Sequence, residues 1–338
     1  MQDDVGPGKR SGSDGPTDGP AGTPPVPRRG RFEENAPALH RFLHSPERRY
    51  VVARELATGV VVVLLVLSIL WGFTGQPVGR SPIVVVESGS MMHCSNGYVP
   101  FGRDCDAPLA RLGTIDPGDL ILVKDIDEAD DVGTRAGEGR SHYGRAGDVI
   151  VFRPDGLTPA QGRTPVIHRA LFFLQVNEDG TFTIEELGLS HVDDLDDPRI
   201  EELGLGRGYA EAMRDARLDP LCGPVGPGRS GFVTRGDNNP AADQGTHSGI
   251  ANCTVQTRWI LGEARGEIPW LGLVKLYATD LPKGCPVLPY STKGPIQPCN
   301  YHNAGGDTKV FLFLTVGALL GGPYLYERIR RARYGEAE

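Results

Sequence analysis

The sequence predicts a mainly β extracytoplasmic domain flanked by two transmembrane helices. Two uncharged apolar segments lie in the N-terminal quarter and near the C-terminus of the 338-residue chain. Between them, short runs of β-branched and aromatic residues are bounded by Gly, Pro or Asp, a pattern typical of β-strands. All six cysteines also lie between the two segments. An even number of cysteines confined to this part indicates disulfides in an oxidising compartment.

The first apolar segment, residues 56–73, contains no charged residue. As a helix it would be about 27 Å long, close to the hydrocarbon thickness of a bilayer. It begins too far from the N-terminus and is too long for the apolar core of a cleaved signal peptide. We therefore expect a retained transmembrane helix. Before it we expect a disordered cytoplasmic tail over residues 1–35, where Gly, Pro, Ser and Asp are frequent, and a juxtamembrane segment over 36–55.

The second apolar segment, residues 310–326, is shorter and has glycines and a proline near its end. Its length fits a second transmembrane helix or, alternatively, a buried core helix. Basic residues cluster before the first segment and after the second, whereas only Arg80 follows the first closely. Because basic flanks stay in the cytoplasm, we expect both termini inside, with residues 327–338 as a cytoplasmic tail. Residues 74–309 would then lie outside, in a multi-pass protein of the cell membrane.

Seven stretches between the apolar segments have the composition of strands. They are residues 82–87, 119–124, 148–153, 165–176, 180–185, 230–236 and 254–263. Two insertions interrupt them. The first, residues 92–117, has two cysteines and indicates a disulfide-pinned loop. The second, residues 177–229, carries 13 acidic and five basic residues and a predicted short helix over 209–217. It would form a lid, a partner surface or merely a solvated addition.

Six cysteines allow 15 disulfide pairings. We expect local pairs for Cys94–Cys105 and Cys285–Cys299, which leaves Cys222–Cys253. The chain has no pair of CxxC motifs, so we expect no zinc site and no other metal or cofactor. The outer part, with the first apolar segment included, carries 32 acidic and 22 basic residues. This acidic balance disfavours binding to nucleic acid.

Three groups of residues could carry chemistry. Ser88 and Ser90 follow the first predicted strand, and a serine hydroxyl becomes a good nucleophile only with a base within hydrogen-bond reach. His168, in the strand "VIHRA", is the candidate base, and Asp237 and Asp243 are candidate carboxylates to orient it. Each has a simpler explanation when taken alone: a serine turn, a core histidine with a satisfied ring, and turn-forming aspartates.

The order of these pieces resembles the type I signal peptidases of the archaeal and endoplasmic-reticulum branch. The matching stretches are "SGSM" (88–91), "PGDLILV" (117–123), "AGDVIVF" (146–152), "VIHRA" (166–170) and "RGDNNPAADQ" (235–244). The later "RGEIPWLGLVKL" (265–276) is similar to the closing segment of that family. Together these stretches cover most of residues 82–276 apart from the insertions.

The resemblance implies a β-rich catalytic domain and a serine endopeptidase that removes signal peptides from secreted preproteins on the outer face of the membrane. Ser90 would be the nucleophile and His168 the general base, at the position where bacterial relatives have a lysine. The Ser90 amide and the Ser88 hydroxyl would form the oxyanion hole. The acidic residues of the family map to Asp237 and Asp243, and which of them pairs with the histidine stays open.

The implied partners are signal peptides, the lipid bilayer and the protein-translocation channel. The chain departs from the family at Met92-His93, where a pair such as Glu-Pro is usual, and in its two insertions. Lys124 and Lys275 are the nearest substitutes for a lysine base, and both look structural. Two alternatives stay open: a catalytically inactive membrane-anchored binding or scaffold protein on the same fold, and a self-cleaving regulatory serine protease.

Overall fold

The computed structural model describes residues 46–76, 80–93, 113–137, 140–205, 226–244, 250–283 and 306–334, with five single residues at 42, 44, 222, 224 and 304. Several predictions lie outside this part of the chain. They concern the N-terminal tail, the start of the juxtamembrane segment, most of the first insertion, the helix over 209–217 and the disulfides Cys94–Cys105 and Cys285–Cys299. Contacts divide the chain into two compact units, Met1–Val66 and Leu67–Glu338.

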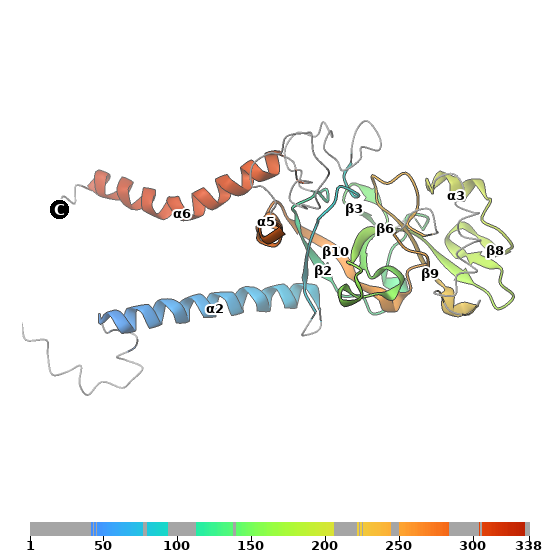
Figure 1. Ribbon diagram of the computed structural model, residues 1–338, viewed down its shortest axis with the longest axis horizontal. Coiled ribbons are helices and arrows are strands. Elements are labelled where there is room, and N and C mark those ends of the chain that lie inside the picture. The colour runs from blue at the N-terminus through green and yellow to red at the C-terminus, as the bar shows by residue number, and fades with distance from the viewer. Residues whose placement is uncertain are drawn as a thin grey trace, which may run out of the picture. The chain divides into compact units, whose positions relative to one another are not determined.

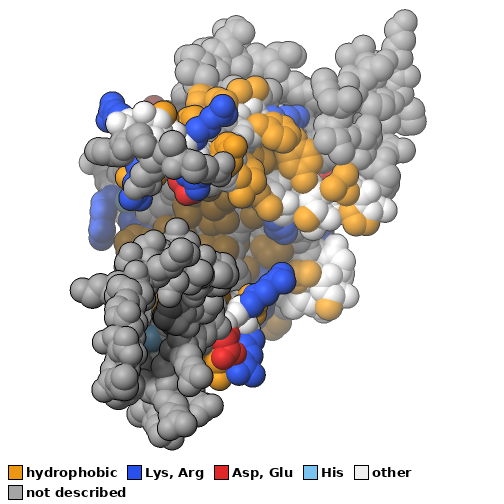
Figure 2. Space-filling model, turned by 90° about the vertical axis from the view of Figure 1, so that its left-hand side faces the viewer, with side chains coloured by type: hydrophobic (Ala, Val, Ile, Leu, Met, Phe, Trp, Pro, Cys, Tyr) orange, Lys and Arg blue, Asp and Glu red, His pale blue; other side chains and the backbone are white. Residues whose placement is uncertain are grey.

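Two helices are long and apolar enough to cross a membrane: α2 (Arg48–Thr74) and α6 (Gly306–Tyr334). Both helices run beyond the predicted apolar segments. Helix α2 begins at Arg48, so Arg48–Glu55 of the predicted juxtamembrane segment belong to it, and α6 continues through the basic residues as far as Tyr334. Most of their large hydrophobic side chains are exposed, unlike those of a core helix. Hydrophobic side chains cover much of the described surface in Figure 2.

The unit from Leu67 onward is built on an antiparallel β-sheet (Figure 1). Its strands run in the order β1-β2-β10-β5-β6-β7-β8, and β9 also pairs with β6. The strands are β1 (Ile83–Val85), β2 (Leu120–Lys124), β5 (Val149–Phe152), β6 (Val166–Val176), β7 (Phe182–Ile184), β8 (Leu189–Val192), β9 (Gly231–Arg235) and β10 (Ile260–Ile268). A separate ribbon pairs β3 (Ser141–His142) with β4 (Arg145–Ala146). The prediction of a β-rich domain with two long apolar helices is confirmed, and the structure shows that the sheet is antiparallel.

The predicted strand over 254–263 is wrong in its bounds. Residues Thr257–Trp259 form a 3-10 turn, and β10 begins at Ile260 and continues to Ile268 between β2 and β5. An irregularity in the pairing at Gly262 shifts the register there. A Cβ at Gly262 would lie 2.3 Å from the Lys124 carbonyl oxygen, so only glycine fits this position. Strands β3, β4 and β8 were not predicted, because "SH", "RA" and "LSHV" carry too few β-branched or aromatic residues to stand out as strands.

The first half of the acidic insertion shares a hydrophobic core with the second half of β6. Strands β7 and β8 and helix α3 (Pro198–Glu202) lie together at one end of the sheet (Figure 1). Their apolar side chains pack against the second half of β6. The buried members include Leu171, Phe172, Leu174, Phe182, Ile184, Leu189, Leu195, Ile200 and Leu203. Residues 177–205 are therefore more than a solvated addition.

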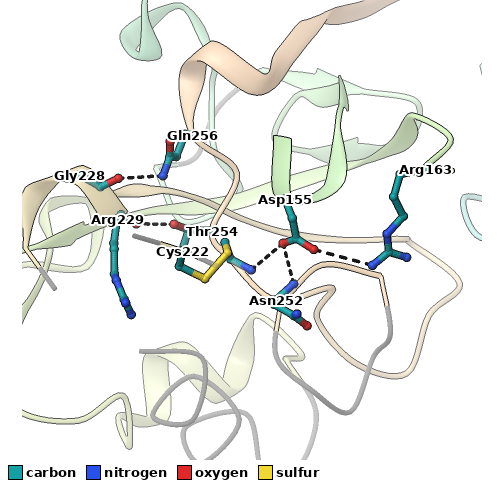
Figure 3. The surroundings of a disulfide bond; sticks show 9 residues. Asp155, Arg163, Cys222, Gly228, Arg229, Asn252, Thr254 and Gln256 are labelled. Atoms are coloured by element: carbon teal, nitrogen blue, oxygen red, sulfur yellow. Dashed lines mark hydrogen bonds and ion pairs between the residues drawn. A yellow bond between two sulfur atoms is a disulfide. The ribbon is translucent and has the colours of Figure 1, made fainter. Parts of the chain in front are cut away.

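The predicted disulfide between Cys222 and Cys253 is present. Beside it, one oxygen of Asp155 accepts hydrogen bonds from the backbone N–H groups of Asn252 (2.9 Å) and Cys253 (3.0 Å), as Figure 3 shows. Arg163 lies 3.7 Å from the other Asp155 oxygen. These contacts fasten the segment before β10 to the turn that follows β5.

Helix α5 (Leu273–Asp280) and the start of α6 share a small core. Trp270 stacks on Phe311 with ring centroids 5.2 Å apart, and its indole N–H donates to the Thr315 hydroxyl at 3.2 Å. Leu273 and Leu276 pack with Leu312 in the same cluster. The beginning of α6 is thereby held against the sheet domain, because β10 leads directly into this region.

Candidate active site

Ser90 lies in a turn that follows β1. The N–H of Met92 donates to the Gly89 carbonyl at 3.2 Å and closes this turn. Met91 is 1% exposed and packs with Val86 and Ile121 in the core between β1, β2 and β5. Because Met91 is anchored inside, the neighbouring Ser90 is held half-buried at the surface of the domain.

His168 lies on β6 beside Ser90. Its Nε2 is 2.8 Å from the Ser90 Oγ, and its Nδ1 is 2.6 Å from an oxygen of Asp243. An ionised carboxylate can only accept, so Nδ1 carries the proton and the lone pair of Nε2 accepts from the serine hydroxyl. The ring is 3% exposed and Asp243 is fully buried. The three side chains therefore form one hydrogen-bonded line from a buried carboxylate to a half-exposed hydroxyl.

Asp243 is fixed by β9. The N–H of Asp243 donates to the Thr234 carbonyl at 2.8 Å, and the Thr234 hydroxyl donates to the same Asp243 oxygen that faces His168, also at 2.8 Å. Gln244 completes the contact, since its amide bonds both the N–H (2.9 Å) and the hydroxyl (3.0 Å) of Thr234. Strand β9 pairs with β6, so the two strands set the distance between carboxylate and imidazole.

Asp237 contacts Arg169 rather than His168. The fully buried guanidinium donates from Nε (2.8 Å) and Nη2 (2.6 Å) to the two oxygens of this carboxylate. His93 donates to it as well, with Nε2 2.7 Å from an oxygen. Burial by itself raises the pKa of Asp237, but the hydrogen bonds from Arg169 and His93 outweigh burial and hold that pKa well below its ordinary value.

The Arg169 side chain links Asp237 to the β3–β4 ribbon. Its Nη1 donates to the backbone carbonyls of His142 (2.9 Å), Arg145 (3.1 Å) and Gly147 (2.5 Å). A buried guanidinium needs such a set of acceptors, because an unpaired charge in the interior is very unfavourable. Of the two carboxylates that the sequence left open, Asp243 contacts the histidine and Asp237 balances the charge of Arg169.

The turn after β9 also holds the backbone of the serine turn. The N–H of Asn238 donates to the Ser90 carbonyl at 2.8 Å, and its side-chain amide donates to the Gly89 carbonyl at 3.0 Å. A Cβ on Gly236 would lie 2.7 Å from the Ser90 carbonyl oxygen, so glycine is required for this close approach. The "GDNN" motif thus supplies both the partner of Arg169 and the support of the serine turn.

Two donors could stabilise negative charge next to Ser90. The exposed Ser88 hydroxyl lies 3.3 Å from the Ser90 Oγ. The N–H of Ser90 donates no hydrogen bond to any residue in the described ranges. Both positions agree with the donors expected for an oxyanion hole, whose task is to bind the charge that develops on a carbonyl oxygen.

The lysines considered as alternative bases lie elsewhere. Lys124 is exposed at the end of β2, and Lys275 forms an ion pair with Glu87 at 3.4 Å. Among the other described histidines, His191 pairs with Asp179 at the surface, at 3.4 Å. His142 lies in a cluster with Asp148 and Glu263 that could hold a metal ion.

Four residues near the site were not singled out as contributors from the sequence: His93, Arg169, Thr234 and Asn238. Arg169 was the easiest to find, because a charged residue in the middle of an apolar strand requires a buried partner. Asn238 stands inside the quoted "GDNN" motif, but its contact with a turn almost 150 residues earlier leaves no trace in local sequence.

Comparisons of the chain with models of protein families, with characterised proteins and with solved structures gave no match. The geometry of this site is therefore the basis on which a function can be assigned.

Proposed function

We propose that the protein is a membrane-anchored serine endopeptidase with Ser90 as nucleophile, His168 as general base and Asp243 as the carboxylate that orients the base. The observation that carries this proposal is the hydrogen-bonded line Ser90–His168–Asp243, with distances of 2.8 and 2.6 Å. Each link has the length that proton transfer requires, and the base is in turn oriented by a third group.

In the proposed reaction, Ser90 Oγ attacks a peptide carbonyl while its proton passes to His168 Nε2. The imidazolium that forms is stabilised by the buried Asp243 carboxylate. The oxyanion is bound by the Ser90 N–H and the Ser88 hydroxyl, each such donor contributing about 3 kcal/mol in known enzymes. His168 then gives its proton to the leaving amine as the C–N bond breaks. Water, deprotonated by the same histidine, hydrolyses the acyl-enzyme and releases Ser90.

We further propose that the substrates are signal peptides of secreted preproteins, as the resemblance to type I signal peptidases implies. Two observations support this. β1 is an edge strand of the described sheet and leads into the serine turn, so an extended peptide could add beside it. The two helices long enough to cross a membrane would keep the site near the bilayer surface, where such cuts occur.

The proposed arrangement places both termini in the cytoplasm and the sheet domain outside, on the basis of the basic flanks. The disulfide between Cys222 and Cys253 supports an oxidising location for the domain. The protein-translocation channel is a proposed partner, because preproteins emerge from it at the outer face.

The test is cleavage of a secretory preprotein by the full chain in detergent. We expect Ser90→Ala, His168→Ala and Asp243→Asn to lose processing, and Lys124→Ala, which removes an exposed lysine, to retain it. Equal cleavage by wild type and Ser90→Ala would overturn the proposal. So would a folded wild type that cuts no preprotein, which is the result expected of an inactive scaffold. A chain that shortens on standing only when Ser90 is intact would instead indicate a self-cleaving regulatory protease.

A further inference from the structure

A second cluster of polar side chains lies apart from the Ser90 line. It contains His142 from β3, Asp148 just before β5 and Glu263 from β10. One nitrogen or oxygen atom of each residue lies within 4.8 Å of the corresponding atoms of the other two. The three residues come from segments far apart in the sequence, so the fold itself assembles the cluster.

The two carboxylates are deeply buried and incompletely bonded. Asp148 is 2% exposed and Glu263 is 1% exposed. One oxygen of Asp148 accepts from the N–H of Gly133 at 2.7 Å, but Oδ1 has no hydrogen-bond partner among the described residues. The same holds for Oε1 of Glu263. Buried carboxylate oxygens without donors are rare, and either a proton shared between the Asp148 and Glu263 side chains or a bound cation would satisfy them.

One distance in the cluster has the length expected between two ligands of a small cation. His142 Nε2 is 3.4 Å from Asp148 Oδ1. Two ligands of a tetrahedral zinc ion, each at about 2.0–2.1 Å from the metal, lie about 3.4 Å apart. Imidazole nitrogen and carboxylate oxygen are both ligands of zinc, whereas Mg²⁺ and Ca²⁺ prefer six or more oxygens.

A positive charge already occupies the centre of the cluster. Arg265 has Nη1 at 2.5 Å from His142 Nε2 and at 4.0 Å from Asp148 Oδ1, and Nη2 at 2.7 Å from the second oxygen of Glu263. Since Arg can only donate, His142 Nε2 must present its lone pair, as a metal ligand does. The Arg265 side chain is 15% exposed, and a bound cation would have to displace it outward while the two carboxylates remain inside.

We propose that His142, Asp148 and Glu263 bind a divalent transition-metal ion of the zinc type, in place of the Arg265 guanidinium. The sequence predicted no metal, because it lacks paired cysteine motifs and these ligands are scattered along the chain. Bound metal would fix the β3–β4 ribbon, whose His142 carbonyl accepts from Arg169 at 2.9 Å. Arg169 in turn holds Asp237 and, through the turn after β9, the Ser90 backbone. The metal site is therefore structural and does not touch the nucleophile.

The experiment uses the full chain in detergent, freed of metal with a chelator that is then removed. Zn²⁺ is titrated in competition with a chromophoric zinc indicator, and bound zinc is counted after desalting. We expect one zinc ion per chain for wild type. Affinity should fall at least tenfold in His142→Asn and Glu263→Gln. It should be unchanged in the control His191→Asn, which removes a surface histidine that also faces a carboxylate.

Arg265→Met separates a metal site from a purely structural ion-pair network. Removing the competing guanidinium should raise zinc affinity at least tenfold if the three ligands bind metal. Zinc affinity unchanged or weakened in Arg265→Met, wild-type affinity retained by His142→Asn, or no stoichiometric zinc on wild type would each overturn the proposal. His142 is partly exposed, so its variant keeps the test decisive if Glu263→Gln fails to fold. Zinc binding is measured without substrate, so its outcome is independent of whether the protein cleaves preproteins.

Discussion

Changing Asp237 to asparagine should mainly lower stability, whereas changing Asp243 to asparagine should mainly lower the cleavage rate. Asp237 receives three donors: Nε and Nη2 of Arg169 and Nε2 of His93, at 2.6 to 2.8 Å. In Asp237→Asn an amide NH₂ replaces one oxygen and faces at least one of these donors. The buried guanidinium of Arg169 also loses its counter-charge. Asp243→Asn removes the carboxylate that His168 and Thr234 contact, and the cation that this carboxylate influences, Arg235, is only partly buried.

The magnitudes follow from these contacts. Removing one partner of a buried ion pair costs about 3–5 kcal/mol. For a unit of this size each kcal/mol shifts the unfolding temperature by about 2–4 °C, so Asp237→Asn should unfold about 6–20 °C lower than wild type. Asp243→Asn should unfold within about 4 °C of wild type, since it weakens a hydrogen bond by about 1 kcal/mol. Its amide can donate to His168 Nδ1 and force the proton onto Nε2, which should lower the cleavage rate about 10⁴-fold.

The assay pairs thermal unfolding in detergent with single-turnover cleavage of a preprotein, measured below the unfolding temperature of every variant. Asp179→Asn, an exposed aspartate beside an exposed histidine, serves as the control and should change neither quantity. The reasoning is refuted if Asp237→Asn unfolds with wild type while cleavage is lost, and Asp243→Asn cleaves at the wild-type rate. That pattern would make Asp237 the carboxylate that supports the base.

Three further outcomes follow from the structure. Gly236→Ala should lower the cleavage rate about 100-fold, because its Cβ would lie 2.7 Å from the Ser90 carbonyl oxygen and must push the serine turn aside; wild-type activity would contradict this. Replacing Cys222 and Cys253 by alanine should lower the free energy of unfolding by about 4 kcal/mol, from a separation of 31 residues, as measured by denaturant titration; equal stability would show that the bridge does not restrain the unfolded chain. The lowered pKa of Asp237 contributes stability that is present above its unfolded pKa and lost as pH falls through the folded value. Wild type should therefore lose unfolding free energy below about pH 4 more steeply than Asp237→Asn, and parallel curves would contradict the ion pair.

Much of the fold could be predicted because each strand of the sheet core carries its own pattern. The run "VIVF" is buried on both faces and "LILV" on one face, and neither needs distant information to be recognised as a strand. The end of β10 could not be predicted, because "RGEI" is polar and is a strand only through its pairing with β2. Strand β8 could not be predicted for the same reason, since "LSHV" becomes a strand only by pairing with β7.

The candidate site shows the same division between local and distant information. Adjacent residues of a strand point to opposite faces of the sheet, so His168 and Arg169 had to have separate partners. The pairing of β5 with β6 agrees with this, because His168 is opposite Ile150 and Arg169 is opposite Val149. Ile150 and Val149 belong to different hydrophobic clusters. Two buried polar groups on opposite faces require two carboxylates, and the "GDNNPAAD" stretch carries two. The sequence could therefore predict that both aspartates are used. Which one serves the histidine depends on the path of the turn after β9, and only the assembled structure contains that path.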